Sequence, residues 1–355
     1  MATKKQPIPA KPAPTRRQLA RWQREKKMQR ATMIVIAVAI AVILGIPALG
    51  YYQTFVAPNL LPVVKVNDRA FDMGYYAKHL RLLYLGAKAT GGQANLSTVP
   101  FELLDIIEEN ELIRQGTPKM NVTVTPEEIT EELKRRVLPP SDPKETTDPA
   151  RLETEFQQLY RQRLNEYKLS DEEYRDMVNA ELLRGKLREV LGLQVPTVAE
   201  QVKLKAVLVE TEDKAQEALE KLKGGADFAT IVKEYNRTEE LKEKEGDLGW
   251  LPMGVMDEAF DNVAFDLEPG SLSKYFTTAQ GLYILKVEDK VSARKIEQEP
   301  RDKLIDKALK KWLTDERAAN DVERYFDSTR YAWAMDELHA FEQPTPQSGD
   351  GGPGG

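Results

Sequence analysis

The chain has 355 residues, enough for two domains of ordinary size, or for two domains and an anchor. It contains no cysteine, which excludes disulfides, thiolate metal sites and a cysteine nucleophile. Only His79 and His339 could act as imidazole bases or ligands, so we expect neither a metal centre nor another cofactor. The net charge is −6, although residues 1–30 are strongly basic, with Glu25 as their single acid. The remainder therefore carries about −15, which argues against binding to nucleic acid.

Residues 32–52, TMIVIAVAIAVILGIPALGYY, are apolar and free of charge. This is the length that a helix needs to cross a bilayer. The basic flank predicts a cytoplasmic tail over 1–30, a single transmembrane helix over 31–55, and a cell-membrane protein whose bulk is extracytoplasmic. A cleavable signal peptide is the main alternative, although the apolar run exceeds its usual length. A buried core helix fits less well, because it would show a polar stripe.

Residues 56–197 predict a helical lobe. A short strand-like run, VVKVNDRAF, ends in a turn and precedes a helix that begins at MGYY. Further helices are expected over 98–114, after Thr125, where Glu128 completes a capping box, and after Ser170. Residues 138–150, LPPSDPKETTDPA, predict an exposed loop.

Residues 198–291 predict a compact α+β domain. The run KLKAVLVE favours a strand, two helices follow, and YFTTAQGLYILKVED reads as two strands around a turn at Gln280-Gly281. Between them lies GDLGWLPMGVMDEAF, residues 246–260, which combines three glycines and a proline with large apolar side chains. This composition predicts an irregular loop that presents apolar groups on a bent backbone.

Residues 292–342 predict a C-terminal helical segment, with one long helix over 301–326. Its apolar stripe needs a partner, which we expect to be the helical lobe; the stripe consists of Ala308, Leu309, Trp312 and Leu313. Residues 343–355 have the composition of a disordered tail.

Residues 201–290 resemble the parvulin family of peptidyl-prolyl cis-trans isomerases. The resemblance rests on the order of the phrases KLKAVLV, GGADFATIVKEYN, GDLGWLPMGVMDEAF, AFDLEPGSLS and FTTAQGLYILKVED. The helical flanks behind a membrane anchor, together with KVNDRAF, are similar in layout to extracytoplasmic folding factors of the SurA and PrsA kind. These resemblances imply a membrane-anchored isomerase and folding factor whose partners are unfolded or partly folded exported polypeptides with X-Pro bonds.

The resemblance also implies a set of site residues. In parvulins the segment after GDLG lines the pocket for the substrate proline, and the matching residues are Leu248, Met256 and Phe260. The polar centre departs from the family. Ala206 and Tyr283 stand where the family has histidines, and Thr238 stands near its aspartate or cysteine, whereas Thr278 matches a family threonine.

Two functions remain open at this stage. One is an isomerase that works by pocket shape and dehydration, with hydroxyl groups from Tyr283 and Thr278. The alternative is a non-catalytic holdase that keeps the same pocket; a purely structural envelope scaffold would need no pocket. The sequence leaves open the oligomeric state, the clients and the residue preferred before proline.

Overall fold

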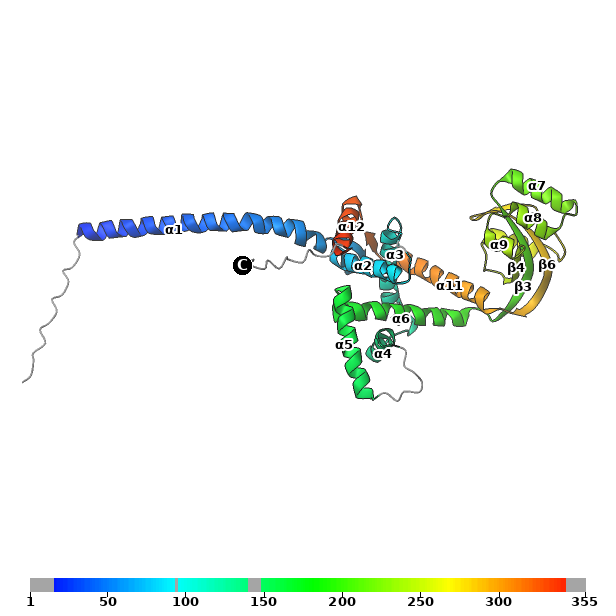
Figure 1. Ribbon diagram of the computed structural model, residues 1–355, viewed down its shortest axis with the longest axis horizontal. Coiled ribbons are helices and arrows are strands. Elements are labelled where there is room, and N and C mark those ends of the chain that lie inside the picture. The colour runs from blue at the N-terminus through cyan, green and yellow to red at the C-terminus, as the bar shows by residue number, and fades with distance from the viewer. Residues whose placement is uncertain (1–15, 93–94, 140–147, 343–355) are drawn as a thin grey trace, which may run out of the picture. The chain divides into compact units, whose positions relative to one another are not determined.

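The computed structural model describes residues 16–92, 95–139 and 148–342 (Figure 1). The expected disordered tail over 343–355 and the first half of the basic tail lie outside this range. The chain divides into two compact units. One comprises Met1–Val63, Ala70–Ala94 and Arg324–Gly355, and the other comprises Val64–Arg69 and Asn95–Glu323.

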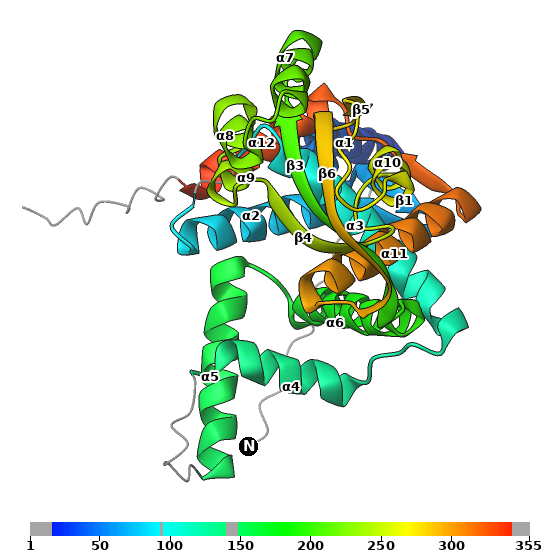
Figure 2. The same cartoon turned by 90° about the vertical axis from the view of Figure 1, so that its right-hand side faces the viewer.

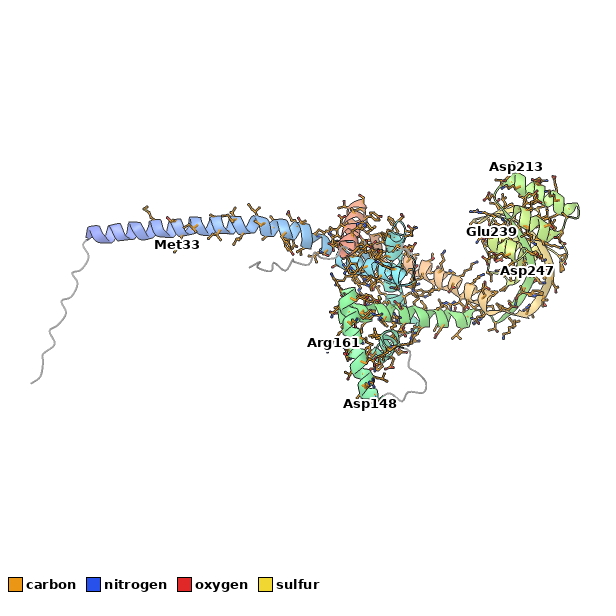
Figure 3. The ribbon with its side chains drawn as sticks, in the orientation of Figure 1. Met33, Asp148, Arg161, Asp213, Glu239 and Asp247 are labelled. Carbon is orange, nitrogen blue, oxygen red and sulfur yellow. The ribbon has the colours of Figure 1, made fainter. Side chains whose placement is uncertain are left out.

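The described part of the first unit begins with helix α1 (Arg16–Tyr51), which includes the second half of the basic segment as well as the apolar run. A short π-helix, η1 (Tyr52–Val56), and a 3-10 turn, η2 (Ala57–Leu60), follow. The stretch Thr32–Thr54 has a mean hydropathy of 2.7 over 23 residues. Those of its apolar side chains that the structure describes are exposed, as Figure 3 shows for Met33, which is 68% accessible. In the described part of the chain, this is the one helix long and apolar enough to be a candidate membrane span.

The rest of the first unit is a pair of helices, α2 (Met73–Ala89) and α12 (Ser328–Glu342). Asp72 caps α2 by accepting a hydrogen bond from the Tyr75 amide at 2.8 Å. The fully buried Tyr76 packs 5.0 Å from the Phe326 ring, and Leu338 of α12 is buried as well. These apolar faces hold the pair together.

Three short strands form a sheet of order β2-β1-β7: β1 (Pro62–Val66), β2 (Arg69–Asp72) and β7 (Val322–Arg324). The single strand expected over VVKVNDRAF is thus a hairpin, since Asn67 adopts a left-handed φ of 52° at its turn. The expectation of one helix over 301–326 is also wrong. Helix α11 (Gln298–Ala319) ends where Asn320 turns extended, and the Asp321 carbonyl then accepts from the Asn67 amide at 2.7 Å.

The second unit contains the helices α3 (Val99–Gly116), η3 (Thr117–Met120), α4 (Pro126–Val137), α5 (Pro149–Tyr167) and α6 (Asp171–Gln194). The capping box predicted at Thr125 and the helix start predicted after Ser170 are both confirmed, and Ser170 also forms a capping box with Glu173. Helix α11 packs on α3 and α6 through an apolar cluster of Ile113, Leu183, Leu187, Leu191, Leu309 and Leu313. Gly116 lets the Trp312 ring approach closely, because a Cβ there would lie 2.8 Å from the ring.

The same unit holds an antiparallel sheet of order β4-β3-β6-β5. Its strands are β3 (Val198–Val209), β4 (Asp247–Pro252), β5 (Phe276–Thr278) and β6 (Gly281–Lys295). The accompanying helices are α7 (Glu212–Lys223), α8 (Phe228–Tyr235), α9 (Glu239–Glu243) and α10 (Glu258–Asp266). Figure 2 shows β3 and β6 side by side at its centre. The predicted α+β class is confirmed.

Side-chain alternation along β3 creates two cores. Ala206 and Leu208 face one cluster, which includes Phe260 and Tyr283, while Val207 faces a second cluster under α7 and α8. The site described below belongs to the first cluster.

Residues 246–260 differ in part from the irregular loop that was expected. Asp247–Pro252 form an edge strand against β3, where proline is tolerated because the outer side of the strand is unpaired. Gly246 has a φ of +80°, and a Cβ on it would lie 2.8 Å from the Ala206 carbonyl oxygen. Glycine is therefore required there for the strand to come this close.

Candidate active site

A cavity of about 630 Å³ opens at the end of β3. It is lined by the end of β3, the segment from Arg237 to Leu248, the loop before α10, the β5–β6 turn, and the start of α11. Figure 3 labels Glu239 and Asp247, which begin α9 and β4 on one of these walls. The residues that line the cavity are up to 95 positions apart in the sequence, since they include both Leu208 and Lys303.

The cavity lining includes apolar side chains as well as polar ones. The aliphatic side chains that line it are those of Leu208, Leu241, Leu248, Leu251, Val255 and Met256. The Tyr283 ring, 4% exposed, completes this lining. It meets Phe260 edge to face at 5.3 Å and 88°, and it stacks on Phe276 at 6.2 Å. These ring contacts fix the orientation of Tyr283.

The Tyr283 hydroxyl donates a hydrogen bond to Gln280 Oε1 at 2.6 Å. Burial raises the pKa of Tyr283, and the nearby Asp257 carboxylate raises it slightly further, so the phenol stays neutral. The acceptor lone pairs of the hydroxyl and the amide N–H groups of Gln280 remain as the polar groups that a peptide could meet here.

Thr238 is held in the cavity wall by Asn236, which is 4% exposed. Asn236 Oδ1 accepts from the Leu208 amide at 2.7 Å. Its Nδ2 donates to the Thr238 carbonyl at 2.8 Å and to Thr238 Oγ1 at 3.2 Å. One buried amide therefore ties the end of β3 to the start of α9.

The structure brings together four of the seven site residues predicted from the sequence. Those that line the cavity are Thr238, Leu248, Met256 and Tyr283. The other three lie outside its lining. Ala206 and Phe260 are core residues at 0% and 1% exposure. The Thr278 hydroxyl is engaged in the hairpin turn, where it donates to the Gly281 carbonyl and accepts from the Gln280 amide, both at 3.1 Å.

Sequence reasoning did not find Asn236, Arg237 or Gln280. The sequence did contain a signal for Asn236. In EYNRT this polar residue follows a helix with an apolar face, where its side chain can hydrogen-bond to nearby backbone groups. Arg237 and Gln280 come together only in the fold. The Arg237 amide donates to the Leu208 carbonyl at 2.8 Å, and its guanidinium donates to the Gln280 carbonyl at 3.3 Å.

The cavity lining includes equal numbers of opposite charges. The basic groups are Arg237, Lys244 and Lys303, and the acidic groups are Glu240, Asp247 and Glu299. Two pairs are bonded: Lys244 to Glu240 at 2.7 Å and Lys303 to Glu299 at 2.8 Å. A cavity lined by both apolar and charged side chains suits a peptide whose side chain is buried while its backbone stays near water.

Two family models match the chain. Residues 197–289 match the PPIC-type PPIase domain, and residues 20–188 match the SurA-like N-terminal domain. The first covers β3 to β6 and so most of the cavity.

Among similar proteins, a foldase protein PrsA of Caldanaerobacter subterraneus is 29% identical over 197 residues, which are 56% of this chain and 59% of that protein. The foldase protein PrsA 4 of Bacillus cereus is 38% identical over 26% of this chain and 33% of its own length. The chain thus spans about a third to three fifths of these two relatives. A crystal structure of a PrsA peptidylprolyl isomerase from Bacillus anthracis is 19% identical, with a TM-score of 0.38, over 68% of this chain and 98% of its own.

The peptidyl-prolyl cis-trans isomerase pin4 of Neurospora crassa is 36% identical over 96 residues, 26% of this chain and 72% of that protein. The predicted family resemblance is confirmed: the chain belongs to the PPIC-type, or parvulin, family of peptidyl-prolyl cis-trans isomerases.

Proposed function

We propose that this chain is a peptidyl-prolyl cis-trans isomerase and folding factor that acts on exported polypeptides with X-Pro bonds. The observation that carries the proposal is a cavity of about 630 Å³ within a PPIC-type domain, whose lining includes the side chains of Met256, Leu248 and Tyr283. Its substrate would be an extended segment that places its proline ring against these three side chains.

The chemistry needs no covalent intermediate. Rotation of the amide before proline is opposed by a barrier of about 18–20 kcal/mol, because it breaks the C–N resonance. The twisted amide has lost charge separation, so a dry apolar cavity favours it over the planar, strongly hydrated ground state. Each ~1.4 kcal/mol of this preference is tenfold in rate.

The residues take distinct roles in this proposal. Met256 and Leu248 receive the proline ring and exclude water. The hydroxyl groups of Tyr283 and Thr238 lie on the same cavity wall as possible partners for the rotating amide. The site is a reduced one, because Ala206 supplies no polar group.

The alternative function is a holdase that binds proline segments without accelerating isomerisation. It is favoured by the engagement of the Thr278 hydroxyl in its own turn and by the apolar burial of Ala206. In both cases a position that the resemblance assigns to the polar centre supplies no polar group to the substrate.

A refolding assay separates the two. The full chain in detergent or nanodiscs is added to a protein whose refolding is limited by proline isomerisation. We expect acceleration, and a three- to tenfold loss of it in Met256→Ala, equivalent to about 0.7–1.4 kcal/mol. Met253→Ala is the matched control, because Met253 is 58% exposed and is not part of the cavity lining. Suppressed aggregation with no acceleration would select the holdase.

We also propose that α1 anchors the chain in the cell membrane, with the basic end inside and the PPIC-type domain extracytoplasmic. Support comes from the apolar stretch Thr32–Thr54 and the basic residues before it. Protease added outside intact cells should then cleave between residues 60 and 340. Complete protection of this region, in cells whose surface is accessible, would contradict the topology.

A further inference from the structure

Two residues that line the cavity come from outside the PPIC-type domain. Glu299 and Lys303 belong to α11, whereas the domain match ends at residue 289. The helix that follows the domain therefore forms part of the wall of the cavity.

The first half of α11 is fixed against the loop that carries Met256. Leu304 packs on the apolar cluster of the domain, and its Cδ2 lies 3.0 Å from the position of a Cβ on Gly254. The Lys307 ammonium group donates to the Met256 carbonyl oxygen. Gly254, at a φ of +94°, lets the loop approach the helix this closely.

The opposite side of α11 is fixed to α6. Arg188 bonds Asp302 at 3.1 Å and Asp306 at 2.8 Å, and Arg301 donates to the Gly192 carbonyl at 2.7 Å. Glu299 and Lys303 are thus presented by a helix that is held from two sides.

The charges of α11 face those of α9. Glu240 and Lys244 line the cavity from α9 and the residue after it, and Glu299 and Lys303 line it from α11. Lys244 chiefly lowers the pKa of Glu240, and Lys303 lowers it further. Glu240 chiefly raises the pKa of Lys244, with a smaller contribution from Glu299. These contributions show that the two pairs are within electrostatic reach of each other.

We propose that Glu299 and Lys303 are specificity-determining residues that set which charge is accepted beside the substrate proline. This inference rests on the proposed function, since it concerns the same cavity. With three basic and three acidic groups, the cavity lining has no net charge, so we expect the wild-type site to bind Glu-Pro and Lys-Pro segments about equally. Removing one charged group from α11 gives the lining a net charge and therefore a preference.

The test uses the full chain in detergent and short peptides with Glu, Ala or Lys before proline. Exchange NMR measures isomerisation, and line broadening of the same peptides measures binding in the same sample. Glu299→Gln should raise the preference for Glu-Pro over Lys-Pro about threefold or more, and Lys303→Met should lower it by a similar factor. In about 0.5 M salt both changes should shrink, since the Debye length falls to about 4 Å and exposed charges are screened.

The matched control is a second ion pair on the same helix. Lys311 and Asp315 are four residues apart, bonded at 2.9 Å, exposed, and not part of the cavity lining. Lys311→Met and Asp315→Asn should leave the peptide preference unchanged. A purely structural role for Glu299 or Lys303 would lower binding of all three peptides alike.

The outcomes separate this inference from the proposed function. If the wild type neither binds nor isomerises the peptides, both fail. If it isomerises them and the α11 variants keep the wild-type preference, only the role of α11 is overturned. If it binds without catalysis and the variants shift the binding preference, the α11 proposal stands and the holdase is selected.

Discussion

Removal of the Asn236 side chain should loosen the end of β3 and the cavity wall together. Asn236→Ala leaves the buried Leu208 N–H without its acceptor and removes two bonds to Thr238. An unsatisfied buried donor costs about 1–3 kcal/mol, while water can replace part of the half-buried Thr238 contacts. We therefore expect a loss of about 2–4 kcal/mol in local stability.

Hydrogen exchange over residues 201–209 of the full chain measures this loss. Amides near Leu208 should exchange about 30- to 1,000-fold faster, because each ~1.4 kcal/mol is a factor of ten. Thr238→Val is the control, since it keeps the Asn236 bond to Leu208, and exchange should stay within about fivefold of wild type. Exchange in Asn236→Ala within threefold of wild type would refute the reasoning.

Asn236→Asp adds a dependence on pH. The carboxyl group keeps the acceptor for Leu208 but sets its second oxygen against the Thr238 carbonyl, which lies 2.8 Å from Nδ2. The folded state therefore favours the protonated acid, and its pKa rises above the unfolded value of about 3.9. The variant should approach wild-type protection below that value and lose protection as the pH rises through the folded pKa. Equal protection at pH 3 and pH 7, relative to wild type, would contradict this.

Three further variants test other contacts. Tyr283→Phe keeps the ring contacts with Phe260 and Phe276 and loses the bond to Gln280, so isomerisation should fall less than tenfold; abolished activity would show that the hydroxyl is essential. Phe260→Ala, unlike Met256→Ala, should cost about 3–5 kcal/mol in stability by urea unfolding, because Phe260 is 1% exposed. Arg135 and then Arg136 lower the pKa of Glu132 to about 2, so its stabilisation is complete above about pH 4.5 and is lost as the pH falls through about 2. Glu132→Gln should remove this pH-dependent contribution to stability, about 0.5–1 kcal/mol, as measured by thermal unfolding at several pH values. An unchanged dependence of stability on pH would exclude Glu132 as its source.

Local signals in the sequence predicted much of the fold. The caps at Thr125 and Ser170 each mark a helix start that the structure has, because a side-chain acceptor for an unpaired amide is a local need. One missed feature depends on a distant partner. Strand β7 pairs with β1 only when residues far apart in the chain meet, and no short pattern in the sequence records that pairing, whereas the missed hairpin at Asn67 is a local turn between two neighbouring strands.

The candidate site divides in the same way. The family phrases place Met256, Leu248 and Tyr283 in one cavity, because each lies in a motif of fixed order. Glu299 and Lys303 lie beyond the last motif, in a helix whose charged residues look like an ordinary solvated face. Their position on the cavity wall follows from the packing of Leu304 on the domain, which the periodicity of α11 alone does not specify.

Two of the three expected departures at the polar centre, Ala206 and Tyr283, belong to one packing arrangement. Ala206 pairs with Leu285 across β3 and β6, and Tyr283 pairs with Leu208, so Ala206 and Tyr283 are diagonal neighbours on one face of the sheet. Aromatic side chains reach such diagonal positions. Both residues lie in one apolar cluster, in which Ala206 is 0% exposed. A histidine at 206 beside the tyrosine would overpack the core by about 1–3 kcal/mol. The small residue and the large ring therefore compensate in volume, so the apolar cluster stays filled.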